Sequence, residues 1–141
     1  MGTSIIGLRY FNIFGEGQTL EYAGVITKFL DRIRERKSPI IFGDGSQIRD
    51  FVFVQDIVMA NLLAMTSNVT NSLINIGTGN ALTILELANM VIDISKLELK
   101  PIFEKPLEGD IKKSHADVSL AIQTLNWKPK KDLREWLMEV I

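Results

Sequence analysis

The chain has 141 residues, 46% of them hydrophobic and 23% charged, a balance typical of one globular domain large enough to bury a core. Its formal net charge of −1 argues against partners such as nucleic acid or an anionic membrane, and no apolar run is long enough to span a bilayer. The absence of cysteine excludes disulfides and thiolate metal sites, so we expect a reducing, cytoplasmic setting and no metal.

The first half of the chain predicts β-strands that alternate with α-helices. Short apolar runs bounded by glycine or proline are typical of buried strands, and apolar residues three or four positions apart indicate the inner face of a helix. Asp56 stands before one such helix and is expected to cap it. In chain order, the pattern predicts a strand at residues 4–10, a helix at 22–37, strands at 39–42 and 51–54, and a helix at 56–65.

The second half continues this alternation. Thr83 and Glu86 have the spacing of a capping box, so a helix is expected to begin there with Leu87, Ala88 and Val91 on its buried side. No repeat or linker interrupts the pattern, which predicts one α/β domain over residues 1–141. The remaining predicted elements are strands at 73–76 and 99–103, and helices at 118–125 and 133–141.

Arg49 is a candidate for anion binding. Strand alternation places its side chain on the same face as Phe51 and Phe53. A guanidinium can bind two phosphate oxygens at once, so a diphosphate would be a natural partner. An ordinary ion pair at the solvated end of the strand explains the same pattern, and the residues by themselves favour this second interpretation.

Other candidate motifs are weaker. Gly43-Asp44-Gly45 is interpreted as a turn between strands, and Gly77-Thr78-Gly79 as a strand-to-helix turn, because Leu82 stands where a dinucleotide fingerprint requires glycine. Asn12 can either bond a ligand or satisfy loop backbone. His115 is expected to be an exposed residue without a catalytic role. The sequence indicates no catalytic triad and no acid/base pair of carboxylates.

Several motifs follow one another in a characteristic order along the chain. They are Arg9-Tyr10-Phe11-Asn12 with Gly15, Ile41-Phe42-Gly43-Asp44-Gly45, Arg49-Asp50-Phe51-Val52, Asp56, Asn75-Ile76-Gly77-Thr78-Gly79, Glu108-Gly109-Asp110, Ala116-Asp117 and Asn126-Trp127-Lys128-Pro129. Taken together, these motifs resemble the extended short-chain dehydrogenase/reductase family, the NAD-dependent epimerases and dehydratases. The similarity runs over nearly the whole chain and is greatest to UDP-glucose 4-epimerases and related UDP-sugar epimerases.

This resemblance implies an α/β fold that is the C-terminal portion of an extended Rossmann-type epimerase. The chain would form the last sheet strand and a small, mixed α/β substrate-binding domain. In that family an upstream domain holds NAD, and a Tyr-x-x-x-Lys pair performs the acid/base work while the sugar is epimerised at C4. Neither Tyr10 nor Tyr22 has a lysine four positions downstream. We therefore expect a fragment that binds no NAD and is inactive by itself.

What the resemblance implies for this chain is binding of a UDP-sugar. Phe11 matches a position close to the nicotinamide and the sugar. Many relatives carry an arginine where this chain has Leu107, and loss of that clamp is expected to weaken binding about tenfold or more. The implied substrate contacts are Asn12 and Arg49 at the diphosphate, the backbone around Val25, Ile40 and Phe42 at the base, and Asp110 at the ribose.

Two further interpretations are compatible with the sequence. The first is a fragment of a dTDP-sugar dehydratase or another nucleotide-sugar enzyme of the same family. The second is a non-catalytic interaction module, in which the strand that contains Ile5, Ile6 and Leu8 pairs with another chain. That chain would be a second copy, giving a homodimer, or a separate N-terminal cofactor-binding half.

Overall fold

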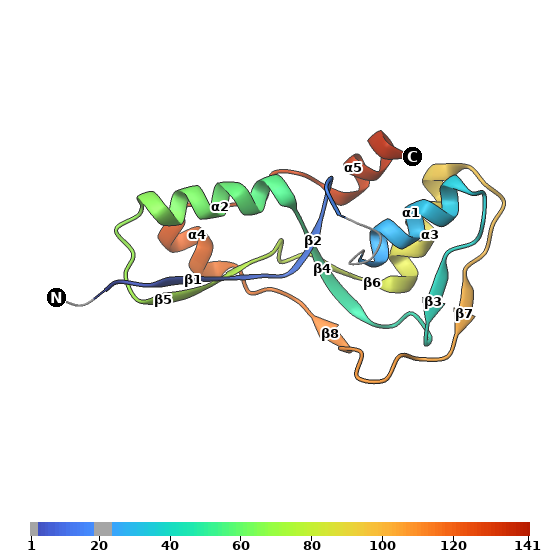
Figure 1. The fold of residues 1–141 in the computed structure, drawn as a ribbon, viewed down its shortest axis with the longest axis horizontal. Helices are drawn as coiled ribbons and strands as arrows, with labels where there is room; N and C mark the ends of the chain where they lie inside the picture. Colours follow the sequence, from blue (N-terminus) through green and yellow to red (C-terminus); the bar gives the residue numbers. More distant parts are fainter. Residues whose placement is uncertain (1–2, 19–23) are drawn as a thin grey trace.

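A computed structural model describes residues 3–18 and 24–141 of the chain. Helices gather at both ends of an elongated molecule, and strands lie beside each group of helices as well as between the two groups (Figure 1). The first elements are β1 (Ile6–Tyr10), β2 (Asn12–Phe14), α1 (Val25–Arg34), β3 (Ile40–Phe42), β4 (Ile48–Phe53) and α2 (Val54–Thr66). They are followed by β5 (Ser72–Ile76), β6 (Ala81–Thr83), α3 (Ile84–Ser95), β7 (Ile102–Glu104), β8 (Lys113–Ser114), α4 (Ser119–Leu125) and α5 (Leu133–Val140).

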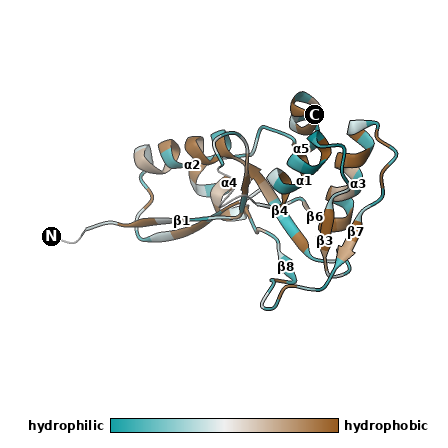
Figure 2. Ribbon diagram, turned by 45° about the vertical axis from the view of Figure 1, so that its right-hand side comes forward, coloured by the Kyte–Doolittle hydropathy of each residue, from teal (hydrophilic) through white to brown (hydrophobic). Residues whose placement is uncertain are grey.

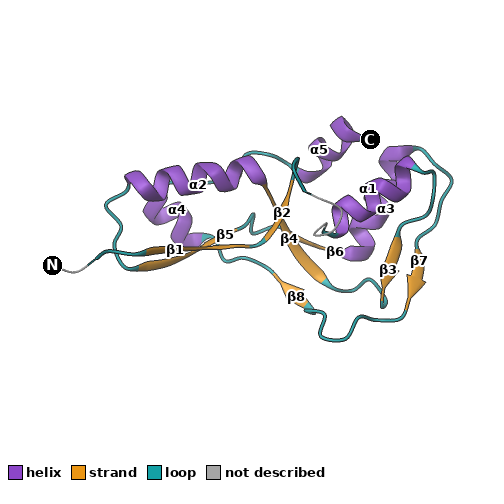
Figure 3. Ribbon diagram, in the orientation of Figure 1, coloured by secondary structure: helices purple, strands orange, loops and turns teal. Residues whose placement is uncertain are grey.

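The strands form small, mostly parallel sheets. β1 pairs in parallel with β5, and β3 pairs in parallel with β7. Between these pairs, β4 lies parallel to β2 and β8 and antiparallel to β6. The loop of residues 105–112 joins β7 to β8 along one side of the molecule (Figure 3). The chain is therefore a mixed α/β protein, as the sequence predicts.

The larger hydrophobic core lies among α1, α3 and α5. Helix α1 buries Phe29 and Ile33, and α3 buries Leu87 and Val91, because these residues recur on one face of each helix. The predicted capping box is confirmed. The Thr83 hydroxyl oxygen accepts a hydrogen bond from the Glu86 amide, and the Glu86 carboxylate accepts one from the Thr83 amide at 2.7 Å. These bonds from Thr83 hold the pKa of Glu86 below its usual value.

The second core lies where α2 and α4 cover the β1–β5 pair. Ile74 and Ile76 of β5 are fully buried there, and Trp127 packs beside them. The indole Nε1 of Trp127 donates to the Asp56 carbonyl oxygen at 2.9 Å. None of the helices in the described part of the chain is long and apolar enough to cross a membrane.

The structure corrects the predictions around β4, the start of α2 and the Gly77-Thr78-Gly79 turn. β4 begins at Ile48 because its first residues pair with β6 and β8, and Val54 belongs to α2. The helix cap is therefore Phe53, and the buried Asp56 carboxylate instead accepts the amides of Lys130 and Lys131 at 3.0 and 3.1 Å. The short strand β6 intervenes between the Gly77-Thr78-Gly79 turn and α3.

The other predicted elements are present with small shifts. The helix predicted at 22–37 ends at Arg34, and the predicted start at residue 22 lies outside the described residues. The strand predicted at 99–103 forms at Ile102–Glu104. The predicted helices near 118–125 and 133–141 are confirmed as α4 and α5.

Candidate functional site

A cavity of about 530 Å³ lies among the start of α1, the strands β2, β3 and β4, and the loop of residues 105–112. Apolar side chains, among them Phe29, Phe51 and Leu107, make up much of its wall. Every residue that the family resemblance places at the ligand lies in the wall of this one cavity, although their individual roles stay predictions. These residues are Phe11, Asn12, Val25, Ile40, Phe42, Arg49 and Asp110.

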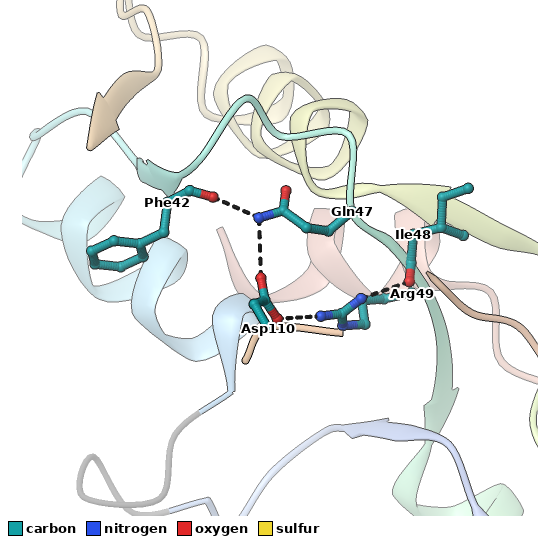
Figure 4. Close-up of polar contacts among 5 residues, drawn as sticks. All are labelled: Phe42, Gln47, Ile48, Arg49 and Asp110. Atoms are coloured by element: carbon teal, nitrogen blue, oxygen red, sulfur yellow. Dashed lines mark hydrogen bonds and ion pairs between the residues drawn. The ribbon is translucent and has the colours of Figure 1, made fainter. Parts of the chain in front are cut away.

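Arg49 is held by an ion pair within this cavity wall. Its Nη2 donates to Oδ1 of Asp110 at 2.6 Å, and its Nη1 donates to the carbonyl oxygen of Ile48 at 2.8 Å (Figure 4). Only 13% of the Arg49 side chain is exposed, against 29% for Asp110. The guanidinium is therefore positioned at the cavity and not in bulk water, with Asp110 as its present anionic partner.

Gln47 holds the other oxygen of Asp110, a role that no local sequence signal indicates. Its Nε2 donates to the carbonyl oxygen of Phe42 at 2.6 Å and to Oδ2 of Asp110 at 3.1 Å (Figure 4). The opposite amide orientation would turn an oxygen toward these two acceptors, so the hydrogen bonds determine the assignment. Gln47 therefore ties the end of β3 to the loop that carries Asp110.

Asn12 joins the cavity to the central strands. It is the first residue of β2, in register with Phe51 of β4. Its Nδ2 lies 3.4 Å from the carbonyl oxygen of Asp50, a long hydrogen bond. The side chain thus contacts neighbouring backbone and lines the cavity at the same time, so both interpretations drawn from the sequence remain compatible with its position.

Asp50, which sequence reasoning overlooked, follows Arg49 in β4 and is fully buried. Its carboxylate accepts the Thr78 amide at 2.7 Å, the Thr78 hydroxyl at 2.6 Å, the Gly79 amide at 2.9 Å and the Ala116 amide at 3.2 Å. Four donors can stabilise a buried carboxylate without a cationic partner. Asp50 therefore joins β4 to the turn after β5 and to the segment after β8.

This arrangement also decides what the Gly77-Thr78-Gly79 turn can hold. The amides of Thr78 and Gly79 already donate to Asp50, and a Cβ added at Gly77 would lie 2.5 Å from the Cβ of Ala116. The turn is thus filled by the protein's own side chains. It does not fit the pyrophosphate of NAD, and Phe11 remains the chain's one predicted contact to that cofactor.

The remaining polar motifs have structural partners. In the Gly43-Asp44-Gly45 turn, hydrogen bonds from the Ser46 hydroxyl and amide hold the pKa of Asp44 below its usual value. His115 is exposed, and its Nε2 lies 2.9 Å from the Gly79 carbonyl oxygen. Within residues 3–18 and 24–141, no three acidic or histidine side chains are grouped to hold a metal ion.

Comparisons with known proteins show which proteins this chain is similar to. A protein of Methanocaldococcus jannaschii, assigned provisionally as a UDP-glucose 4-epimerase, is 42% identical over 135 residues, covering 95% of this chain and 43% of that protein. The structure of UDP-glucose 4-epimerase from Thermotoga maritima with UDP-glucose matches with a TM-score of 0.89 and 39% identity, covering 94% of this chain and 43% of that one.

A third relative binds a different UDP-sugar. The UDP-N-acetylglucosamine 4-epimerase of Methanobrevibacter ruminantium, in complex with UDP-N-acetylmuramic acid, matches with a TM-score of 0.87 and 37% identity, covering 97% of this chain and 44% of that one. The chain therefore spans less than half the length of these relatives. The profile of the NAD dependent epimerase/dehydratase family matches residues 1–77, more than half of the sequence. The chain accordingly belongs to the NAD dependent epimerase/dehydratase family.

Proposed function

We propose that this chain binds the nucleotide part of a UDP-sugar and serves as the substrate-binding portion of a UDP-glucose 4-epimerase-like enzyme. The observation that carries the proposal is the position of Arg49, whose largely buried guanidinium lines a cavity together with Asn12 and Asp110. The similarity to structures that contain UDP-glucose and another UDP-sugar supports the same ligand class. Arg49 and Asn12 would contact the diphosphate, and Asp110 would accept a ribose hydroxyl.

The base would lie against the apolar part of the wall. Val25 begins α1, and Ile40 and Phe42 lie on β3, so two elements provide backbone groups and apolar surface around one position. An apolar wall with a few polar groups is the usual composition of a small-molecule site. Epimerisation with NAD would require a glycine-rich cofactor loop and a Tyr-x-x-x-Lys pair from elsewhere, so we expect the 141-residue chain to bind without turnover.

Replacing Arg49 with Ala is expected to weaken UDP binding about tenfold or more, because a charge-assisted hydrogen bond contributes about 1.5–3 kcal/mol. Isothermal calorimetry with UDP and UDP-glucose would measure the change. Arg34→Ala is the matched control, since Arg34 lies on α1 with 59% of its side chain exposed and pairs with Asp31.

Equal affinity of Arg49→Ala and the unmodified chain for UDP would refute the phosphate role. A parallel titration with dTDP tests the alternative within the same family. Tighter binding of dTDP than of UDP would favour a dTDP-sugar enzyme, because the two nucleotides differ only at the base and the ribose.

The outer face of α2 supports a second proposal, that the chain pairs with another polypeptide. Val58, Leu62 and Met65 are 52%, 50% and 81% exposed and form one stripe along the helix. Hydrophobic residues occupy most of the length of α2 (Figure 2), and a helix that is apolar on all sides is normally covered on all sides. A separate cofactor-binding half or a second copy of the chain would provide that cover.

Light scattering distinguishes these partners. If a second copy covers the stripe, the chain should have twice its 15.9 kDa monomer mass, and Leu62→Lys should return it to the monomer because a buried lysine charge is unfavourable in such an interface. Met138→Lys on α5, a helix of the other core, is a comparable change at an exposed apolar residue. A monomer mass for the unmodified chain at high concentration would refute pairing between copies.

A further inference from the structure

We propose that Asp110 makes the cavity select nucleoside diphosphates against inorganic phosphates. Its carboxylate stays paired with Arg49 unless a ligand offers both a diphosphate and a hydroxyl group. This inference deepens the proposed function, because it rests on Arg49 as the diphosphate contact. It assigns Asp110 a role in specificity in addition to any contact with the ribose.

The first step is the charge beside the guanidinium. Oδ1 of Asp110 lies 2.6 Å from Nη2 of Arg49, so the guanidinium that would contact the diphosphate is already paired, although Lys28 also lines the cavity. A free anion that approaches Arg49 must either displace this carboxylate or come to rest beside it. Two like charges about 4 Å apart repel by about 1 kcal/mol in water and more where solvent is partly excluded, as it is here.

The second step is that Asp110 is anchored independently of Arg49. Its Oδ2 accepts Nε2 of Gln47, which also donates to the carbonyl oxygen of Phe42. A Cβ at Gly43 would lie 3.3 Å from this Nε2, so the turn after β3 packs closely around the amide. The carboxylate therefore stays in the cavity wall even when Arg49 turns toward another anion.

The third step is the difference between the two classes of ligand. Inorganic pyrophosphate presents mainly acceptor oxygens, so it gains nothing from the Asp110 carboxylate and is repelled by it. A nucleoside diphosphate carries ribose hydroxyls, which can donate to that carboxylate and offset the repulsion. Because the Asp110 carboxylate disfavours inorganic pyrophosphate more than a nucleoside diphosphate, it raises specificity for the nucleotide without raising affinity.

Asp110→Asn tests this role, because the amide keeps the size of the side chain and removes its charge. We expect the affinity for inorganic pyrophosphate to rise about fivefold or more, which means that its Kd falls by the same factor. The ratio of the pyrophosphate Kd to the UDP Kd should therefore fall by a similar factor. Isothermal calorimetry of the 141-residue chain with each ligand gives both values at one ionic strength.

Asp44→Asn is the matched control. It removes the same charge from the neighbouring Gly43–Gly45 turn, where the carboxylate bonds to Ser46 and not to Arg49. An unchanged ratio in this variant, beside the lowered ratio in Asp110→Asn, would support the proposal. An equal change in both variants would overturn it, because the effect would then be one of net charge alone.

The outcomes also separate this inference from the proposed function. If UDP binds the unmodified chain but Asp110→Asn leaves the ratio unchanged, the selectivity role is wrong and the UDP site stands. If UDP binds neither form while Asp110→Asn alone gains pyrophosphate binding, Asp110 masks Arg49 and the UDP proposal is wrong. If Asp110→Asn gains no pyrophosphate binding in any test, the inference is overturned.

Discussion

Replacing Asp50 with Asn is expected to lower the free energy of unfolding by about 3–5 kcal/mol, because the buried amide of Ala116 and the half-buried amide of Gly79 would lose their acceptor. The asparagine oxygen can still accept the amide and hydroxyl of Thr78. Its NH₂ group, however, would face the amides of Gly79 and Ala116, which are also donors. Urea unfolding followed by circular dichroism would measure the loss, which is a large part of the stability of an ordinary domain.

Asp44→Asn provides the comparison for this measurement as well. Asp44 is exposed and accepts two bonds from Ser46, so its replacement should cost less than about 1 kcal/mol. A loss below about 1 kcal/mol for Asp50→Asn would show that its four hydrogen bonds do not hold the core together. A similar loss for both variants would point to a general effect of charge.

The consequence of Asp50 for function comes from its neighbours. Arg49 and Phe51 both line the cavity, and the carbonyl oxygen of Asp50 accepts the long bond from Asn12. The buried carboxylate fixes this part of β4 against two other segments of the chain. Asp50 is thus a positioning residue for the candidate diphosphate contacts, although it does not line the cavity itself.

Local signals were sufficient to predict most helices. The inner faces of α1 and α3 follow from residues three or four positions apart, and the capping box of α3 follows from Thr83 and Glu86, because all these interactions lie within one or two turns. The single α/β pattern is predictable for the same reason. The family resemblance, and not the periodicity, brought Arg49 and Asp110 into one predicted site.

Interactions between distant segments were not predictable from local pattern. Arg49 and Asp110 are 61 positions apart, and Asp50 and Ala116 are 66 positions apart, so only the folded chain brings them together. Asp56 is an example, because local pattern predicts it as a helix cap and the cap is Phe53. Its place before an apolar run resembles a helix cap, but its carboxylate bonds to amides more than 70 positions away. β6 and β8 are too short to show the alternation of apolar and polar residues by which a strand is predicted.

Gly77→Ala should lower the free energy of unfolding by about 2–3 kcal/mol, because overpacking a close backbone contact is costly. The new Cβ would lie 2.5 Å from the Cβ of Ala116 and 3.1 Å from Oδ2 of Asp50. Since Gly77 does not have a positive φ, the expected loss is steric and not conformational. Urea unfolding gives the value, and Gly24→Ala is the control, because the nearest atom there is 3.9 Å away.

A double-mutant cycle separates the two contacts of that Cβ. In an Ala116→Gly background the contact with Ala116 is gone, so Gly77→Ala should cost at least about 1 kcal/mol less than it does in the unmodified chain. The cost that remains would come from the Asp50 carboxylate, whose bonds to Gly79 and Ala116 allow little movement. An equal cost in both backgrounds would place the strain at Asp50 alone, and no cost in either would mean that the turn after β5 can move away from β4.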